Sequence, residues 1–184
     1  MFPPVALVAA MAAQIGAATE MLGMNVPDQF QVGNHAENGE ADIVELVQPP
    51  ETVDNWSQLI TGLTFLNAAH TGLGDFYAIW RDQIRKICPG LADTRVRGLV
   101  DGHAAIRSTL SCPKNPQTGK PENLTAFLIQ GDANMMVAQV AFRRSIAPAD
   151  KALTDLFGAS LKICDQRKLS ACSARKASGF VPAK

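Results

Sequence analysis

The sequence predicts an α+β domain in which an antiparallel sheet of about six or seven strands is packed by two main helices. Strand-like runs follow one another with short turns between them, which favours antiparallel pairing. Two other segments carry apolar residues at helical spacing. The length of 184 residues suits one domain with a sizeable core.

Three extended segments come first, at residues 30–32, 43–47 and 58–66. The first two flank a Gly/Asn-rich turn. The second ends at the proline pair 49–50, because proline lacks the N–H that a strand ladder needs. The third is apolar on both alternating faces, which is typical of a central strand covered on both sides.

Residues 74–90 give the clearest helical pattern of the chain. Asp75 is placed to cap the N-terminus, and the pair Pro89 and Gly90 ends the helix. The apolar stripe that we expect to be buried contains Phe76, Ile79, Trp80, Ile84 and Ile87.

Two hairpins follow, at residues 94–112 and 124–142. Asp101 and Gly102 form the tight turn of the first, since both residue types tolerate positive φ, and residues 131–134 form the turn of the second. The linker between them, residues 113–123, is rich in Pro, Gly and Asn and predicts a loop.

A second helix is predicted from about residue 148 to 164. The side chains that we expect in phase on its buried face are Leu153, Leu156, Phe157, Leu161 and Cys164. The predicted order of elements is therefore β-β-β-α-β-β-β-β-α.

We expect the chain to divide into a signal peptide or N-terminal leader at residues 1–24, a single α+β domain at 25–168 and a polar C-terminal tail at 169–184. Residues 5–13 are apolar and small residues follow, which is typical of a secretory leader cleaved after Ala12 or Ala18. No Lys or Arg precedes Arg81, so the alternatives are a start upstream of Met1 or an N-terminal helix of the domain. We expect a periplasmic or secreted protein, or a cytoplasmic one if the leader is not cleaved.

The balance of acidic and basic residues indicates which classes of partner the chain would not attract. Seventeen basic residues balance seventeen acidic ones, which removes the electrostatic attraction that nucleic acid or an anionic membrane would need. The apolar run near the N-terminus is also shorter than the roughly 20 residues of a membrane span. We therefore predict no nucleic-acid partner and no stable membrane span after removal of the leader.

Four cysteines fit an oxidising compartment, and none forms a C-x-x-C motif that would favour metal or redox chemistry. We expect structural disulfides between Cys88 and Cys112 and between Cys164 and Cys172. The rival pairing of Cys88 with Cys164 stays open, because sequence does not determine connectivity.

Motifs for catalysis, metal binding and cofactor binding do not occur. The chain has no G-x-S-x-G, H-E-x-x-H or G-x-G-x-x-G, and the lysine of Gly119-Lys120 is followed by proline instead of the Ser or Thr of a phosphate loop. The three histidines are predicted in separate loops or turns: His35, His70 and His103. We therefore assign no catalytic residue, metal ligand or cofactor.

The stretch "AENGEAD" gathers Glu37, Glu40 and Asp42 around Gly39. Such a group of oxygens could hold calcium, but the spacing of a 12-residue calcium loop is not met. A solvated hairpin turn is the favoured interpretation.

The segments "ETVDNWSQLIT", "CPG", "CPKNPQTGKPE" and "AFR" resemble segments of exported bacterial proteins of about this size. The layout over residues 28–166 is similar to that of the Mog1/PsbP-like proteins, small α+β domains with an antiparallel sheet between helices. This resemblance implies the fold and no catalytic residues, because that superfamily includes photosystem accessory subunits, a GTPase-binding protein and periplasmic proteins.

Two functional interpretations follow. The first is a non-enzymatic exported module that binds an unknown envelope protein or a small ligand, through a sheet face or through the loop that carries Lys114 and Lys120. The alternative is a small envelope hydrolase or ligand-binding protein with a cleft walled by Trp56, His70 and Tyr77. Trp56 has a simpler role as a plug over the end of the core.

Overall fold

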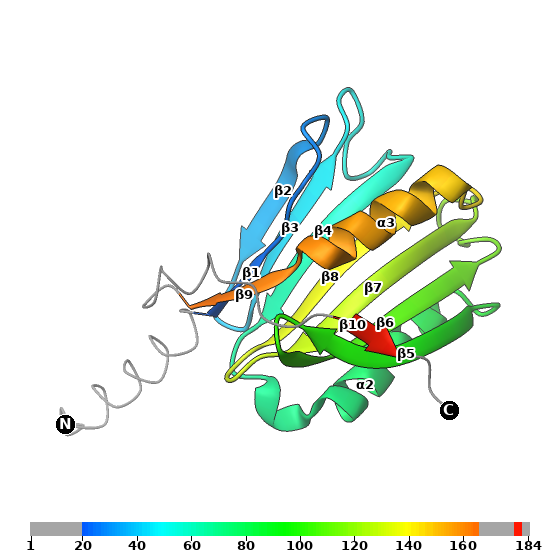
Figure 1. Ribbon diagram of the computed structural model, residues 1–184. Helices are drawn as coiled ribbons and strands as arrows, with labels where there is room; N and C mark the ends of the chain where they lie inside the picture. The colour runs from blue at the N-terminus through cyan, green and yellow to red at the C-terminus, as the bar shows by residue number, and fades with distance from the viewer. Residues whose placement is uncertain (1–19, 166–178, 182–184) are drawn as a thin grey trace, which may run out of the picture.

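The computed structural model describes residues 20–165 and 179–181 of the chain (Figure 1). Its main feature is an antiparallel sheet with the strand order β10-β5-β6-β7-β8-β4-β3-β2. The strands are β2 (Gln31–Glu37), β3 (Ala41–Val47), β4 (Gln58–Phe65), β5 (Ala92–Val100), β6 (His103–Cys112), β7 (Glu122–Gln130), β8 (Met135–Phe142) and β10 (Gly179–Val181). The predicted α+β class and antiparallel sheet are confirmed.

One crossover connection links the two halves of the sheet through the helix α2 (Leu73–Ile87). After β4, a 3-10 turn η1 (Ala69–Thr71) and α2 lead to β5 on the far side, and the two hairpins β5–β6 and β7–β8 then return the chain to β4. Both turns have the predicted form. Asp101 and Gly102 have φ values of 50° and 83°, and the Gly131 N–H donates to the Asn134 carbonyl at 2.9 Å.

The two helices cover opposite faces of the sheet (Figure 1). On the α3 face, Phe157 and Leu161 at the end of α3 (Pro148–Ser160) pack on the side chains of Ile60, Phe127, Ile129, Met136, Ala138, Val140 and Phe142. On the α2 face, Leu73, Phe76 and Tyr77 pack on Ile106, Ala126, Leu128, Met135 and Val137. Alternate residues of β7 and β8 thus supply two cores, as strand geometry requires.

A two-stranded ribbon lies beside the main sheet. It pairs β1 (Glu20–Gly23) with β9 (Lys162–Asp165), and Leu22 packs on the α3 face. The predicted boundaries differ here: the folded region includes residues 20–24, which we assigned to the leader, and β10 lies within the predicted tail. Residues 1–19 and the remainder of the tail lie outside the described ranges.

The details of the first helix differ from the prediction. Its N-cap is Gly72, and Asp75 lies in the first turn, so the predicted capping role is wrong. Ile79 and Ile87 are 57% and 48% exposed and do not belong to the buried face. The helix is instead rotated about its axis so that Tyr77, with its hydroxyl bonded to Asp93, is fully buried.

The second helix ends earlier than predicted. Leu161 is its C-cap in an extended conformation, and Cys164 belongs to β9 instead of the helix. Leu156, predicted to be buried, is 72% exposed. After Leu161 the chain forms β9, which pairs with β1. The sequence pattern had placed β1 outside the domain. Within the described ranges, no helix has the length and apolarity needed to cross a membrane.

Candidate ligand-binding cleft

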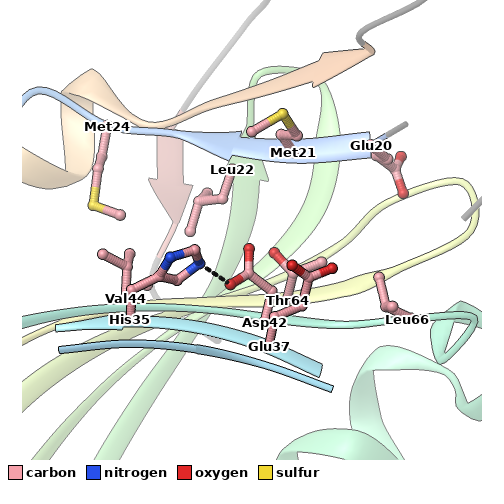
Figure 2. A pocket seen from close by; sticks show the side chains of 11 residues that line it. Glu20, Met21, Leu22, Met24, His35, Glu37, Asp42, Val44, Thr64 and Leu66 are labelled. Atoms are coloured by element: carbon pink, nitrogen blue, oxygen red, sulfur yellow. Dashed lines mark hydrogen bonds and ion pairs between the residues drawn. The ribbon is translucent and has the colours of Figure 1, made fainter. Parts of the chain in front are cut away.

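A cleft of about 340 Å³ lies between β1 and the β2–β4 half of the sheet, on the α3 face (Figure 2). The side chains of β1 form its upper wall and those of the three strands form its floor. Its lining residues are Glu20, Met21, Leu22, Met24, His35, Glu37, Asp42, Val44, Gly62, Thr64 and Leu66.

The polar side of the cleft is organised by a histidine and an aspartate. His35 Nε2 lies 2.9 Å from Asp42 Oδ1, and the two side chains are 57% and 44% exposed. Glu37, Asp42 and Thr64 are direct cross-strand partners on β2, β3 and β4, so their side chains form one row on this face. His35 lies in a strand, which corrects the predicted loop position.

Glu20 lies at one end of the cleft and has a structural role. Its carboxylate accepts the backbone N–H groups of Asp132, Ala133 and Asn134 at 2.8, 3.2 and 2.9 Å, so β1 is joined to the turn between β7 and β8. A Cβ atom on Gly131 would lie 2.5 Å from these oxygens, so only glycine leaves room for the Glu20 carboxylate at this position. Glu37 and Asp42 remain as the carboxylates that face the open cleft.

The apolar side of the cleft depends on Gly62. A Cβ atom there would lie 2.5 Å from Met24 Cε and 3.2 Å from Val44 Cγ1, so glycine lets the side chain of Met24, directly after β1, approach the sheet. Methionine has three rotatable bonds and a polarisable sulfur, and adapts to ligands of different shape. The cleft therefore joins a flexible apolar wall to a negatively charged floor.

The chemistry of the cleft is that of cation recognition. Glu37 and Asp42, the latter also in contact with His35, have carboxylate oxygens that can accept hydrogen bonds from an ammonium or a guanidinium group. Such charge-assisted bonds are stronger than neutral ones. Among residues 20–165 and 179–181, no group of three His, Cys, Asp or Glu side chains is arranged to hold a metal ion.

Trp56, one of the predicted site residues, is 7% exposed. Its indole packs with Val47, Leu59 and Ala141 where β4 begins, and Arg143 lies over the ring. This packing is that of a core side chain at the end of the sheet.

His70 and Tyr77 lie elsewhere. His70 is exposed in η1, after the end of β4, with Nδ1 2.6 Å from the Asn67 carbonyl oxygen. Tyr77 is buried in α2, and its hydroxyl donates to Asp93 Oδ2 at 2.7 Å; burial, together with Asp93, raises its pKa. The length of β4, roughly 25 Å, separates Trp56 from His70, so the structure does not bring the three side chains together.

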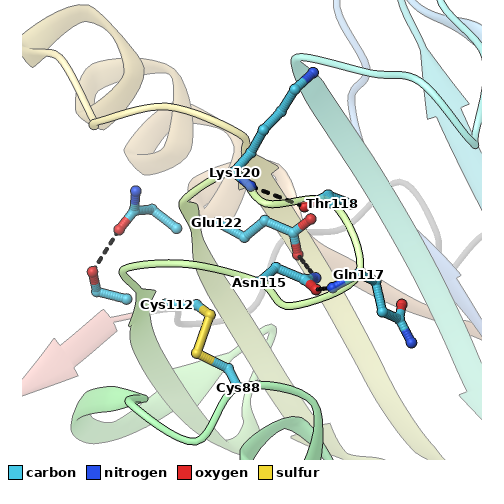
Figure 3. The surroundings of a disulfide bond; sticks show 9 residues. Cys88, Cys112, Asn115, Gln117, Thr118, Lys120 and Glu122 are labelled. Carbon is cyan, nitrogen blue, oxygen red and sulfur yellow. Dashed lines mark hydrogen bonds between the residues drawn. A yellow bond between two sulfur atoms is a disulfide. The ribbon is translucent and has the colours of Figure 1, made fainter.

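The loop that carries Lys114 and Lys120 is anchored by a disulfide and an asparagine (Figure 3). The predicted Cys88–Cys112 bond is confirmed, with an S–S distance of 2.01 Å, and it excludes the Cys88–Cys164 pairing. Cys172 lies outside the described residues, so the second disulfide stays a prediction.

Asn115 gives this loop its shape. Its side chain accepts the Gln117 N–H and donates to Glu122 Oε2, both at 2.9 Å, and its backbone N–H donates to the Lys120 carbonyl at 2.8 Å. Asn115 is only 6% exposed, whereas Lys114 and Lys120 are exposed. The two lysines are thus presented on an ordered surface.

Neither the cleft nor the role of Asn115 was predicted from the sequence. The His35–Asp42 pair has one available signal, which is that both residues flank the same hairpin turn. The contribution of β1 has no such signal, because its strand partner is β9, which lies at the other end of the folded region in the sequence.

Comparisons with known proteins add little to this geometry. No protein-family model and no curated protein matches the chain. Among solved structures it is similar to a Pseudomonas aeruginosa protein of unknown function, with 16% identity, a TM-score of 0.41 and coverage of 73% of this chain and 88% of that one.

Two further structures show comparable similarity. LpqN, described as involved in cell envelope biogenesis of Mycobacterium tuberculosis, has 13% identity and a TM-score of 0.45, with coverage of 79% of this chain and 84% of that one. A Bacteroides thetaiotaomicron protein has 9% identity and a TM-score of 0.46, with coverage of 82% of this chain and half of that one. Likeness at this level establishes neither a family nor an activity, and the Mog1/PsbP-like resemblance stays a prediction.

Proposed function

We propose that the chain is a non-enzymatic binding or accessory module of the cell envelope, and that it binds its ligand in the cleft beneath β1. The observation that carries the proposal is the cross-strand row of Glu37, Asp42 and Thr64, which lies opposite Leu22 of β1 and the flexible side chain of Met24 (Figure 2). The floor supplies charge and the upper wall supplies adaptable apolar contact.

The ligand class follows from this charge. Glu37 and Asp42 disfavour anions, and the neighbouring methionines suit an aliphatic chain, so the ligand is an amine or guanidinium group on a short apolar chain. A lysine or arginine side chain of an envelope partner protein has this chemistry. The Cys88–Cys112 disulfide supports an oxidising location, since such bonds persist outside the reducing cytosol.

A binding titration with agmatine, which carries a guanidinium group and an amine at the two ends of a butyl chain, tests the proposal. We expect saturable binding to the wild-type chain and at least a five-fold weaker affinity for Glu37→Gln, because a carboxylate that faces the ligand is neutralised. Glu40→Gln is the matched control: Glu40 belongs to the same hairpin turn but does not line the cleft. Equal losses in both variants, or no saturable binding, would reject the cleft as the binding site.

A small envelope hydrolase is the second candidate, and one observation favours it. A histidine held by a carboxylate is the arrangement that orients a general base, and His35 and Asp42 form such a pair beside a cleft. Hydrolysis of p-nitrophenyl acetate that disappears in His35→Gln would support this function. Equal rates for the wild type and the variant would remove its support.

A further inference from the structure

A second hollow, the α2 groove, lies on the opposite face of the sheet and has a volume of about 290 Å³. The C-terminal half of α2 forms one wall, with Trp80, Ile84 and Ile87 at positions i, i+4 and i+7 of the helix. Strands β3, β4 and β8 form the floor, and the Cys88–Cys112 disulfide lies at one end.

The position of α2 leaves this groove open. The buried face of the helix contacts the sheet through Phe76 and Tyr77, over β6, β7 and β8. Trp80 and Ile84 are only partly buried, and Ile87 is 48% exposed. The apolar stripe predicted from the sequence is therefore divided: part of it fills the core and part of it lines an uncovered wall.

The floor of the groove contains a polar row between two apolar ones. Glu45, Thr61 and Gln139 are direct cross-strand partners on β3, β4 and β8. The flanking rows on the same face are Ile43, Leu63 and Val137 on one side and Val47, Leu59 and Ala141 on the other. Three strands thus place hydrogen-bonding groups side by side in an apolar surface.

The Thr61 hydroxyl is buried, and no hydrogen bond among the described residues accounts for a polar side chain at this position. Thr61 is 2% exposed, and within the described part of the chain its Oγ1 has no hydrogen-bond partner. A buried hydroxyl without a partner loses its hydration without compensation, and valine has nearly the same shape without that cost. A hydroxyl on the floor of a hollow therefore indicates a ligand group that completes its bonding.

The charges around the groove select the kind of ligand group. Glu45 is half-buried and accepts a bond from Asn34 Nδ2 at 2.9 Å. Glu122, at the disulfide end, is paired with Arg143 Nε at 3.0 Å. Glu45 therefore leaves the floor near Thr61 negative, which repels an anionic head group and favours a hydrogen-bond donor.

We propose that the α2 groove binds a small, mainly apolar molecule that carries one hydrogen-bond donor. The donor lies at the row of Glu45, Thr61 and Gln139, and the apolar body lies against Trp80 and Leu63. This site is on the other face of the sheet from the cleft beneath β1, and the inference does not depend on the function proposed for that cleft.

Octan-1-ol is a suitable probe because it has an eight-carbon body and a single hydroxyl. In a titration of the ¹⁵N-labelled full chain, we expect saturable shifts of the amides of Thr61 and Gln139 and of the Trp80 indole N–H. The isomer 1-methoxyheptane, which cannot donate, and the anion octanoate should each bind at least five-fold more weakly. Equal binding of the alcohol and the ether, or shifts confined to β1 and β2, would overturn the proposal.

Two exposed isoleucines on the same helix provide a matched pair of variants. Ile87 lines the groove, whereas Ile79, 57% exposed, does not. Ile87→Glu should weaken octan-1-ol binding at least ten-fold, and Ile79→Glu should change it less than two-fold. Similar losses in both variants would contradict the location.

Thr61→Val separates a ligand role from a structural one. It removes the hydroxyl and keeps the shape, so the unfolding midpoint of the free protein should stay equal or rise. Octan-1-ol affinity should nevertheless fall about three- to ten-fold, the worth of one hydrogen bond. A variant that binds the alcohol as well as the wild type would show that Thr61 does not contact the ligand.

Discussion

The guanidinium carbon of Arg143 lies 4.0 Å from the centre of the Trp56 indole ring. The same side chain donates from Nε to Glu122 Oε1 and from Nη1 to the Asp54 carbonyl oxygen, each at 3.0 Å. Arg143 therefore joins the end of β8, the start of β7 and the polar segment before β4. These contacts explain why a tryptophan follows a polar, proline-led stretch: it closes the end of the core.

Arg143→Lys should lower the free energy of unfolding by about 1–3 kcal/mol, because lysine cannot keep the planar stacking and the fixed hydrogen bonds together. Urea unfolding followed by tryptophan fluorescence measures the change. The control is Arg97→Lys, at an exposed position of β5, which should leave the midpoint unchanged. Equal midpoints for the wild type and Arg143→Lys would show that the arginine contributes nothing.

Gly158 of α3 lies directly against the Phe127 ring, and a Cβ atom there would overlap Phe127 Cζ. Phe127 is 1% exposed and packs between Phe157 and Phe180, so it has no room to move. Gly158→Ala should destabilise the protein by about 1–2 kcal/mol, since overpacking outweighs the gain of about 1 kcal/mol in helix propensity.

Gly74 in α2 is the control for this prediction. A Cβ atom there would meet only Arg97 Nη2, at 3.8 Å, so Gly74→Ala should stabilise the protein by about 0.5–1 kcal/mol. Thermal unfolding of the two variants should therefore shift in opposite directions. Shifts of the same sign would contradict the packing of α3 on the sheet.

Asp150 carries a pH dependence of stability. Arg144 lowers the pKa of Asp150 by a paired hydrogen bond, with a further contribution from the Ala147 N–H at 2.8 Å, and burial opposes both. Because the folded-state pKa lies below the ordinary 3.8, this stabilisation is complete above that pH and is lost as the pH falls through the folded value.

Asp150→Asn should therefore lower stability at pH 7 by about 1–3 kcal/mol and flatten its decline below pH 4. Part of the decline should remain, because the pKa of Glu51 is also lowered: burial raises it, but the Ser57 contacts outweigh this. Urea unfolding at a series of pH values measures both effects. Parallel curves for the wild type and the variant would contradict the assignment.

The Cys88–Cys112 disulfide clamps the end of α2 to the end of β6, across a sequence separation of 24. Replacement of both cysteines with alanine should destabilise the protein by about 3 kcal/mol, according to the loop-entropy relation. Added reductant should lower the midpoint of the wild type at least as far, because it would also reduce the predicted Cys164–Cys172 bond. An unchanged unfolding midpoint in the double variant would show that the bond is not structural.

The main strands could be predicted because their signals are local. The turn at Asp101 and Gly102, the proline pair after β3 and the two-sided apolar pattern of β4 each lie within a few residues of what they determine. By contrast, β9 forms because β1 lies beside it, and no local pattern links segments so far apart.

The candidate sites were harder to predict than the strands. Ile79 and Ile87 belong to a helical apolar pattern, but the part of that stripe that is buried depends on how the helix is placed on the sheet. The buried Tyr77, bonded to Asp93, sets the rotation of the helix about its axis. The carboxylates of the cleft were visible in the sequence as a polar hairpin turn. Their proximity to Met24 follows from the path of β1 and the absence of a side chain at Gly62.

The most direct test of the binding role is a residue-resolved map of agmatine contacts on the ¹⁵N-labelled wild-type chain. We expect saturable shifts of the amides of His35, Asp42 and Thr64, and no shifts of the amides of α2. Shifts scattered over surface carboxylates without saturation, or centred on Trp56 and Tyr77, would contradict this binding role.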